Sequence, residues 1–143
     1  MITVGGIQFG QLSTRFLHKS ERKNGEKFCV LRDYVIKYGD FKLRAPKGTK
    51  TDGASIPRFF WRLIGPPLHA DYAPAAVIHD AAYEGTLLWT EKGVVQLFTR
   101  EEADDLFLFL MEKLGIPPWR RKMMFRAVRW FGKKAWNNNR KNA

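Results

Sequence analysis

The fold is decided by one stretch near the middle of the chain, Asp71-Tyr72-Ala73-Pro74-Ala75-Ala76-Val77-Ile78-His79-Asp80-Ala81-Ala82-Tyr83-Glu84. Its ends are typical of helix ends, because Pro74 suits a first turn, Asp71 is a capping residue type and Gly85 can terminate a helix. Between these ends almost every side chain is apolar, which leaves no face for solvent. We therefore expect a helix that is buried on all sides.

Two ionisable side chains, His79 and Asp80, stand in the middle of this apolar helix. An unsatisfied buried polar group costs about 1–3 kcal/mol, so each must find a partner. Tyr83 follows His79 by four residues and Asp80 by three, the spacings that bring side chains to one side of a helix. The three residues form a candidate site, although a buried histidine held by a carboxylate is often only a satisfied core residue.

The chain around this helix divides into a β-rich half and a helical half. Residues 1–50 contain short β-branched or aromatic runs broken by glycine turns. The predicted strands are Ile2–Val4, Ile7–Phe9, Phe28–Leu31, Tyr34–Tyr38 and Phe41–Arg44. Residues 56–136 are predicted to be helical, starting with a short piece from Arg58 to Leu63, with a hairpin near 87–98 and a frayed basic tail at 137–143. We expect one α+β domain over 1–143, with N-terminal antiparallel β-hairpins packed on three main helices.

The first long C-terminal helix begins with a capping box, in which Thr99 is the cap residue and the side chain of Glu102, three residues later, bonds back to the Thr99 backbone. Gly115 is expected to end it. Its core stripe is Ala103, Leu106, Phe107, Leu110 and Leu114. Asp104 lies about 100° round the axis from this stripe, at an edge from which it can turn inward to another helix, whereas Asp105 points further out.

The last helix is expected to start around Pro117-Pro118 and to run towards Trp136. Its apolar side is predicted to be Trp119, Met123, Ala127, Trp130 and Phe131. The candidate polyanion-binding residues are Arg120, Arg121, Lys122, Arg126, Arg129 and Lys133. A run of charge is commonly just a solvated helix face; the partners it would otherwise attract are nucleic acid, anionic lipid or an acidic protein.

The composition also favours an anionic partner. Lys and Arg number 25 against 14 Asp and Glu, a net charge of +11, which attracts phosphate, anionic lipid or acidic partners. The 45% of hydrophobic residues excludes a disordered chain. The single cysteine, Cys29, excludes an internal disulfide and a cysteine-based structural zinc site. We see no leader pattern and no apolar run of about 18 residues, so we expect no signal peptide and no transmembrane segment.

A second motif, Thr51-Asp52-Gly53-Ala54-Ser55-Ile56-Pro57, combines a glycine turn with a carboxylate and a hydroxyl. Asp52 and Ser55 are either turn and cap residues or partners of the buried cluster. Asp52, Asp80 and Asp104 around one imidazole would orient it and raise its basicity. The predicted catalytic set is His79, Asp104, Asp52, Ser55 and Tyr83.

Other chemistries fit the spacing less well. His69, His79, Asp80 and Asp52 are suitable ligand types for a transition metal but lack the tight spacings typical of such sites. A triad of Ser55, His79 and an aspartate is geometrically possible, but Gly-Ala-Ser-Ile-Pro is not a nucleophile elbow.

Several motifs occur in a fixed order along residues 51–136. They are Thr-Asp-Gly-Ala-Ser-Ile-Pro, Gly65-Pro66-Pro67, Ala-Ala-Val-Ile-His-Asp-Ala-Ala-Tyr, Arg100 with Ala103-Asp104 and Phe107, and Ala127-Val128-Arg129 with Gly132 and Trp136. This set resembles an uncharacterised family of phage and prophage proteins, domain of unknown function 1353. The resemblance implies a small single-domain viral protein of the host cytoplasm or the virion, with phage particle components as partners. It implies no established activity.

His79-Asp80-x-x-Tyr83 is also similar to the His-Asp-x-x-Tyr signature of secreted phospholipases A2. That resemblance implies that His79 is the base for an attacking water, Asp80 a calcium ligand, Asp104 the orienting carboxylate and Tyr83 a supporting donor. The Asp52-Gly53-Ala54 turn could lend carbonyl oxygens, since calcium takes six to eight oxygen ligands. The flanking disulfides and calcium loop of those enzymes are absent from the sequence. The cofactor it suggests is a divalent cation, calcium or zinc.

Two hypotheses follow. In the first, the chain is a small phage hydrolase with a buried His-Asp site. In the second, it is a non-enzymatic tail, particle or host-factor-binding protein, in which the cluster only locks the Asp-Gly-Ala-Ser turn onto the buried helix. Function would then reside in the basic C-terminal helix or the aromatic hairpin. Solvent access to His79 distinguishes the two hypotheses, because a catalytic imidazole must open to a cleft, whereas a structural one can be completely buried.

Overall fold

The computed structural model describes residues 2–18, 20, 28–39, 41–51, 71–90, 98–134 and 136–137. Within these ranges the chain forms two antiparallel sheets from mainly N-terminal strands and three helices from the C-terminal part, which confirms the α+β prediction. The predicted short helix at Arg58–Leu63, the second arm of the hairpin near 87–98 and almost all of the tail lie outside the described residues.

The larger sheet has the strand order β1-β2-β5-β6-β8 and the smaller one β3-β4-β7. The strands are β1 Ile2–Val4, β2 Ile7–Phe9, β3 Thr14–Phe16, β4 Phe28–Val30, β5 Tyr34–Tyr38, β6 Phe41–Ala45, β7 Lys50–Thr51 and β8 Leu88–Thr90. Gly5 and Gly6 join β1 to β2 with φ of 58° and 81°, as a type I′ turn requires at both central positions. The first arm of the predicted hairpin is β8, which pairs with β6 and extends the sheet.

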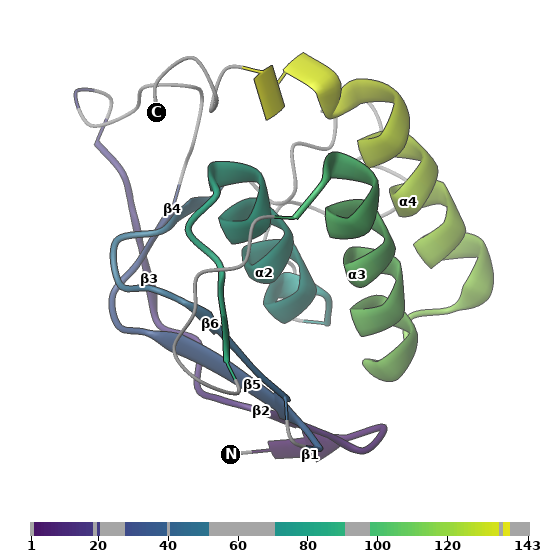
Figure 1. The fold of residues 1–143 in the computed structure, drawn as a ribbon, viewed down its shortest axis with the longest axis horizontal. Coiled ribbons are helices and arrows are strands. Elements are labelled where there is room, and N and C mark those ends of the chain that lie inside the picture. The colour runs from purple at the N-terminus through teal and green to yellow at the C-terminus, as the bar shows by residue number, and fades with distance from the viewer. Residues whose placement is uncertain are drawn as a thin grey trace.

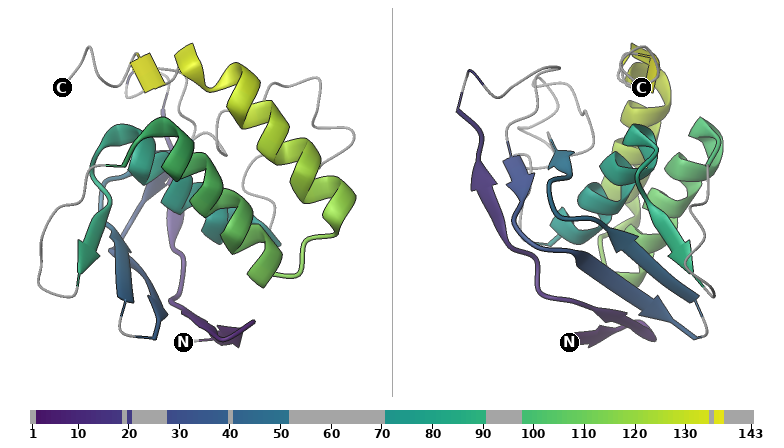
Figure 2. Two further views of the ribbon diagram at one scale, coloured as in Figure 1. Left: turned by 45° about the vertical axis from the view of Figure 1, so that its right-hand side comes forward. Right: turned by 60° about the vertical axis from the view of Figure 1, so that its left-hand side comes forward.

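The three helices lie together on one side of the sheets (Figures 1 and 2). They are α2 Ala73–Glu84, α3 Arg100–Lys113 and α4 Pro118–Phe131. Helix α3 packs against both α2 and α4, and α2 also contacts strands β6 and β7. Helix α2 therefore lies between the sheets and the other helices.

Helix α2 is buried as predicted, with every residue except Pro74 and Glu84 in the interior. Gly85 ends it with φ of 77°, and the N–H groups of Gly85 and Thr86 bond the carbonyl oxygens of Ala82 and Ala81. The predicted cap by Asp71 is wrong. The cap position is Tyr72, one residue later, and the Asp71 carboxylate instead pairs with the guanidinium of Arg120 on α4.

Helix α3 has the predicted ends. Thr99 Oγ1 accepts from the Glu102 N–H, and a Glu102 carboxylate oxygen accepts from the Thr99 N–H, both at 3.1 Å. Gly115, with φ of 82°, follows the last turn, and its N–H bonds the Glu112 carbonyl. The local capping signals were therefore sufficient to place this helix.

The predicted apolar side of α4 is wrong in large part. Its buried residues are Met124, Ala127 and Val128, whereas Trp119 is 58%, Trp130 70% and Phe131 44% exposed. The helix also ends at Phe131, with Gly132 as its C-cap, before Trp136 is reached. The face that α4 presents to α3 is narrow and built from small or flexible side chains, so the aromatic residues that dominated the prediction fall outside it.

Gly132 offers a test of how tightly α4 joins α2. A Cβ added there would lie closest to the Val128 carbonyl oxygen on α4, 2.7 Å from the Tyr83 hydroxyl and 3.2 Å from the Tyr83 ring. We expect Gly132→Ala to lower the free energy of unfolding by about 1–3 kcal/mol, the usual cost of overpacking, in urea denaturation. Since one of the two shortest contacts is with the hydroxyl, Gly132→Ala should cost less in a Tyr83→Phe background, where the contact with the Val128 carbonyl is all that remains below 3 Å. Equal costs in both backgrounds would contradict this contact.

Candidate functional site

Asp104 on α3 is the centre of a buried polar cluster. Its side chain is fully buried, and it accepts hydrogen bonds from His79 Nε2 and the Tyr83 hydroxyl, each 2.7 Å from Oδ1, and from Arg129 Nε, 3.0 Å from Oδ2. The expectation that Asp104 turns inward is confirmed. Asp105 points outward as expected, with 69% of its side chain exposed. Side chains from all three helices therefore converge on one carboxylate.

The imidazole of His79 packs against two aromatic rings. The ring of Tyr83 lies 4.2 Å from it and that of Phe107 4.8 Å, measured between centroids. Both contacts follow from helical spacing, because Tyr83 is one turn from His79 on α2 and Phe107 is three residues from Asp104 on α3. The ring plane of His79 is therefore held as firmly as its Nε2 atom.

The other edge of the imidazole faces Asp80. Asp80 Oδ1 lies 3.7 Å from His79 Nδ1, too far for a hydrogen bond, and the Asp80 carboxylate accepts instead from the Thr51 hydroxyl. His79 Nδ1 is buried and has no hydrogen-bond partner among the described residues. The side chain of Asp80 is 8% exposed, whereas those of His79 and Asp104 are 0% exposed. The imidazole is thus held at Nε2 and unsatisfied at Nδ1, on the side nearer to solvent.

The cluster shifts the pKa values of its members. Burial alone would lower the pKa of His79, but its contacts with Asp104 and Asp80 together raise that pKa above 6.5. Burial opposes ionisation of Asp104 too, yet the bonds from His79, Tyr83 and Arg129 lower its pKa. Burial, reinforced by Asp104, raises the pKa of Tyr83, which stays a neutral donor. The charged pair of imidazolium and Asp104 carboxylate is the favoured state.

The structure brings together four of the predicted site residues: His79, Asp80, Tyr83 and Asp104. Asp52, Ser55 and His69 lie outside the described residues. Arg129 and Thr51 belong to the cluster but were not predicted to. Arg129 was assigned to the polyanion-binding face, because nothing in a helix rich in arginine distinguishes the one that turns inward.

Within the described ranges, no group of three or more His, Cys, Asp or Glu side chains could hold a metal ion. Asp80 has Thr51 and His79 as its neighbours there. A calcium or zinc ion at Asp80 would therefore depend on ligands from outside these ranges, such as Asp52.

The six candidate polyanion-binding residues divide into two groups. Arg120 pairs with Asp71, Arg121 donates to the Ile116 carbonyl at 2.9 Å, and Arg129 bonds Asp104. The other three are exposed on the outer side of the protein: Lys122, Arg126 and Lys133. The first group contributes to the fold, and only the second presents its charge fully to solvent.

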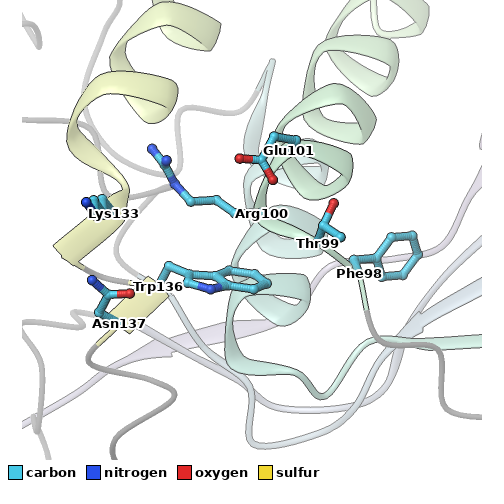
Figure 3. Close-up of a pocket in the computed structure, with 7 residues that line it drawn as sticks. All are labelled: Phe98, Thr99, Arg100, Glu101, Lys133, Trp136 and Asn137. Carbon is cyan, nitrogen blue, oxygen red and sulfur yellow. The ribbon is translucent and has the colours of Figure 1, made fainter.

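A hollow of about 700 Å³ lies beside the cluster, between the start of α3 and the end of α4 (Figure 3). It is lined by Phe98, Thr99, Arg100, Glu101, Lys133, Trp136 and Asn137. Figure 3 shows Arg100 reaching toward α4, where it donates to the carbonyls of Val128, at 3.1 Å, and Arg129. Trp136 packs edge-on against Tyr83, with ring centroids 5.2 Å apart. Tyr83 therefore lies between this hollow and His79.

The raised pKa of His79 predicts how stability depends on pH. The folded state binds the His79 proton more tightly than the unfolded state, so this stabilisation is complete below about pH 6.5 and is lost as pH rises through the folded pKa. Each tenfold difference in proton affinity between the two states contributes about 1.4 kcal/mol. Urea denaturation from pH 5 to 9 should show the loss in the native chain and in His18→Gln, but not in His79→Gln. A native profile that His79→Gln leaves unchanged would rule out His79 as its source.

Comparison with known proteins gives one family match. The family model described as Protein of unknown function (DUF1353) matches residues 28–128, which include His79 and Asp104. Two proteins of Sinorhizobium fredii are similar. Uncharacterized protein y4jT is 36% identical over 91 residues, 64% of this chain and 24% of that protein, and Uncharacterized protein y4iH is 37% identical over 86 residues, 60% of this chain and 32% of that protein.

The chain therefore corresponds to between a quarter and a third of the length of these curated relatives. No solved structure matches the chain. Among the described residues, no helix is long and apolar enough to cross a membrane.

Proposed function

We infer a function for this chain, which belongs to the DUF1353 family, from the geometry of its buried cluster. We propose that it is a small hydrolase in which His79 is the general base. Asp104 orients the imidazole through Nε2, and Tyr83 and Arg129 position Asp104. Asp80 either binds a divalent cation, calcium or zinc, or anchors the segment that begins at Thr51. Asp52 and Ser55 are its proposed partners in that segment.

The observation that carries this proposal is that Nδ1 of His79 is buried and has no hydrogen-bond partner in the part of the chain that the structure describes. A histidine that serves only the core is expected to use both ring nitrogens, since an unpaired buried group costs about 1–3 kcal/mol. A water molecule on Nδ1 would satisfy it. As the water oxygen attacks the carbonyl of an ester, Nδ1 takes the water proton and later returns it to the leaving alcohol. Asp104, fixed on the far side, would stabilise the imidazolium formed.

The order of residues supports the same roles. His79-Asp80-x-x-Tyr83 on one helix, with an aspartate from a second helix bonded to the histidine, is the arrangement that the phospholipase A2 resemblance implied. The likeness covers a few residues, so it supports the roles and not a lipid substrate.

The competing function is non-enzymatic, and one observation favours it. The side chains of His79 and Asp104 are completely inaccessible to solvent. In that case the cluster fastens the helices together, and the protein is a tail, particle or host-factor-binding component. In either case we propose that the protein is of phage or prophage origin and acts in the host cytoplasm or the virion. We also propose that α4 binds a polyanion, either nucleic acid or anionic lipid.

Substitution of His79 separates the two functions. Gln can keep the bond to Asp104 but cannot act as a base, so His79→Gln should lower hydrolysis of p-nitrophenyl acetate at least about 100-fold. Tyr83→Phe, which removes one hydrogen bond to Asp104, is the matched control and should retain most of the activity. Both variants should remain folded by circular dichroism.

The dependence of the hydrolysis rate on pH is a second test, because a merely structural histidine would not affect it. The native rate should rise with pH through a pKa above 6.5, where His79 becomes neutral, and Asp104→Asn should move that rise to lower pH. Addition of EDTA tests the divalent cation. A native rate equal to that of His79→Gln at every pH would exclude the hydrolase and leave the structural function.

A further inference from the structure

We propose that α4 binds single-stranded nucleic acid through one exposed row of side chains, here called the outer row. Its members are Trp119, Lys122, Arg126, Trp130 and Lys133. The inference rests on the polyanion partner proposed for α4 and is independent of the hydrolase. It assigns that partner a class and assigns the contacts to particular residues.

The outer row follows from the spacing of its members. Successive residues are three or four positions apart, so they lie along one side of the helix. Met124, Ala127 and Val128 occupy the opposite, buried side. All five residues of the row are exposed. Lys133 lies just beyond Phe131 and continues the row past the end of α4.

The two tryptophans are the feature that needs a partner. Trp119 is 58% and Trp130 70% exposed, although large aromatic side chains are among those most strongly stabilised by burial. A hollow of about 420 Å³ lies between them, lined by Trp119, Lys122, Met123, Arg126, Ala127 and Trp130. The row therefore combines a concave surface, two accessible indoles and three cations, of which Lys122 and Arg126 line the hollow.

The charge of this surface selects an anion. Helix α4 contains no acidic residue, and none occurs after Glu112 anywhere in the sequence. Arg120 and Arg129 are neutralised by Asp71 and Asp104, but among the described residues no ion pair engages Lys122, Arg126 or Lys133. The outer row thus carries the two exposed cations of the helix, Lys122 and Arg126, and a third, Lys133, beyond its end.

The order of residues in the row favours nucleic acid over a bilayer. A helix that lies in a membrane surface needs a continuous apolar stripe. Here the apolar residues that line the hollow between the two tryptophans, Met123 and Ala127, pack against the core, and the exposed residues between them are Lys122 and Arg126. Alternating indoles and cations instead suit alternating bases and phosphates, because bases stack on aromatic rings while phosphates pair with Lys and Arg.

The strand must be single because a duplex hides the faces of its bases. Trp119 and Trp130 are eleven residues apart, which is about 16 Å along a helix axis at about 1.5 Å per residue. This distance spans about five stacked nucleotides at about 3.4 Å each. A short oligonucleotide is therefore sufficient to test the contact.

The test is fluorescence anisotropy of a labelled twelve-nucleotide oligothymidylate, titrated with the full chain at several salt concentrations. Trp119→Ala/Trp130→Ala should weaken binding about 10-fold or more at an unchanged salt slope, since stacking is lost and no charge is removed. Lys122→Ala/Arg126→Ala should make the slope of log affinity against log salt shallower by about 1.4, the value for two phosphate contacts of a single strand. All substituted side chains are exposed, so the variants should fold.

Matched controls lie on the sheet side of the molecule. Arg32→Ala/Lys47→Ala removes two exposed charges and Tyr38→Ala/Phe41→Ala two exposed aromatic rings, and neither pair should reproduce these effects. Oligonucleotide binding that the tryptophan variant leaves unchanged would overturn the outer row but not the polyanion partner. Binding to phosphatidylserine vesicles without binding to the oligonucleotide would also overturn the nucleic-acid contact of the outer row. It would identify an anionic membrane as the polyanion partner. Binding to neither would overturn both, and the hydrolase would still stand.

Discussion

The structure depends on one buried carboxylate. Asp104 has no exposed surface, and its charge is compensated by groups from the other two helices, His79 and Tyr83 on α2 and Arg129 on α4. Removing one partner of such a buried pair typically costs about 3–5 kcal/mol, because the remaining charge is left without compensation. The relative positions of α2, α3 and α4 are therefore set by an electrostatic requirement as well as by apolar packing. A shift of α2 or α4 would remove part of this compensation, and a shift of α3 would remove all of it.

The electrostatic requirement of the buried carboxylates also determines the protonation of the His79 imidazole and the contacts of its two nitrogens. Since Asp104 holds Nε2 and Asp80 lies 3.7 Å from Nδ1, the charge of each carboxylate favours the protonated ring, and the two nitrogens differ in what they can still bind. Nε2 is committed to the fold. Nδ1 is not, and it lies toward Asp80, the cluster member with the more exposed carboxylate. A structural role explains the first nitrogen completely, but within the described residues it leaves the second without a partner.

Features that depend on neighbouring residues in the chain could be predicted from the sequence. The buried helix, the Thr99–Glu102 capping box, the terminating glycines and the place of Asp104 at the edge of a core stripe are all set within one or two helical turns. Features that depend on a distant partner could not. Asp71 was expected to cap α2, but Arg120, 49 residues away, engages its carboxylate. Strands β3 and β7 were not predicted, and both pair with β4, whose partner residues are at least 12 positions away from β3 and 21 from β7 along the chain. Asp52 and Ser55, outside the described residues, stay predictions.

Helix α4 shows why composition alone gave the wrong face. Aromatic residues are expected inside and arginines outside, yet Trp119 and Trp130 face solvent while Arg120 and Arg129 turn toward carboxylates. Helix α4 packs against α3, and the residues it buries are Met124, Ala127 and Val128. The five basic residues of α4 are thereby divided. Arg120, Arg121 and Arg129 bond carboxylates or a carbonyl and belong to the fold, so the charge of the helix available to a partner is smaller, and Lys122 and Arg126 carry it beside the two exposed rings.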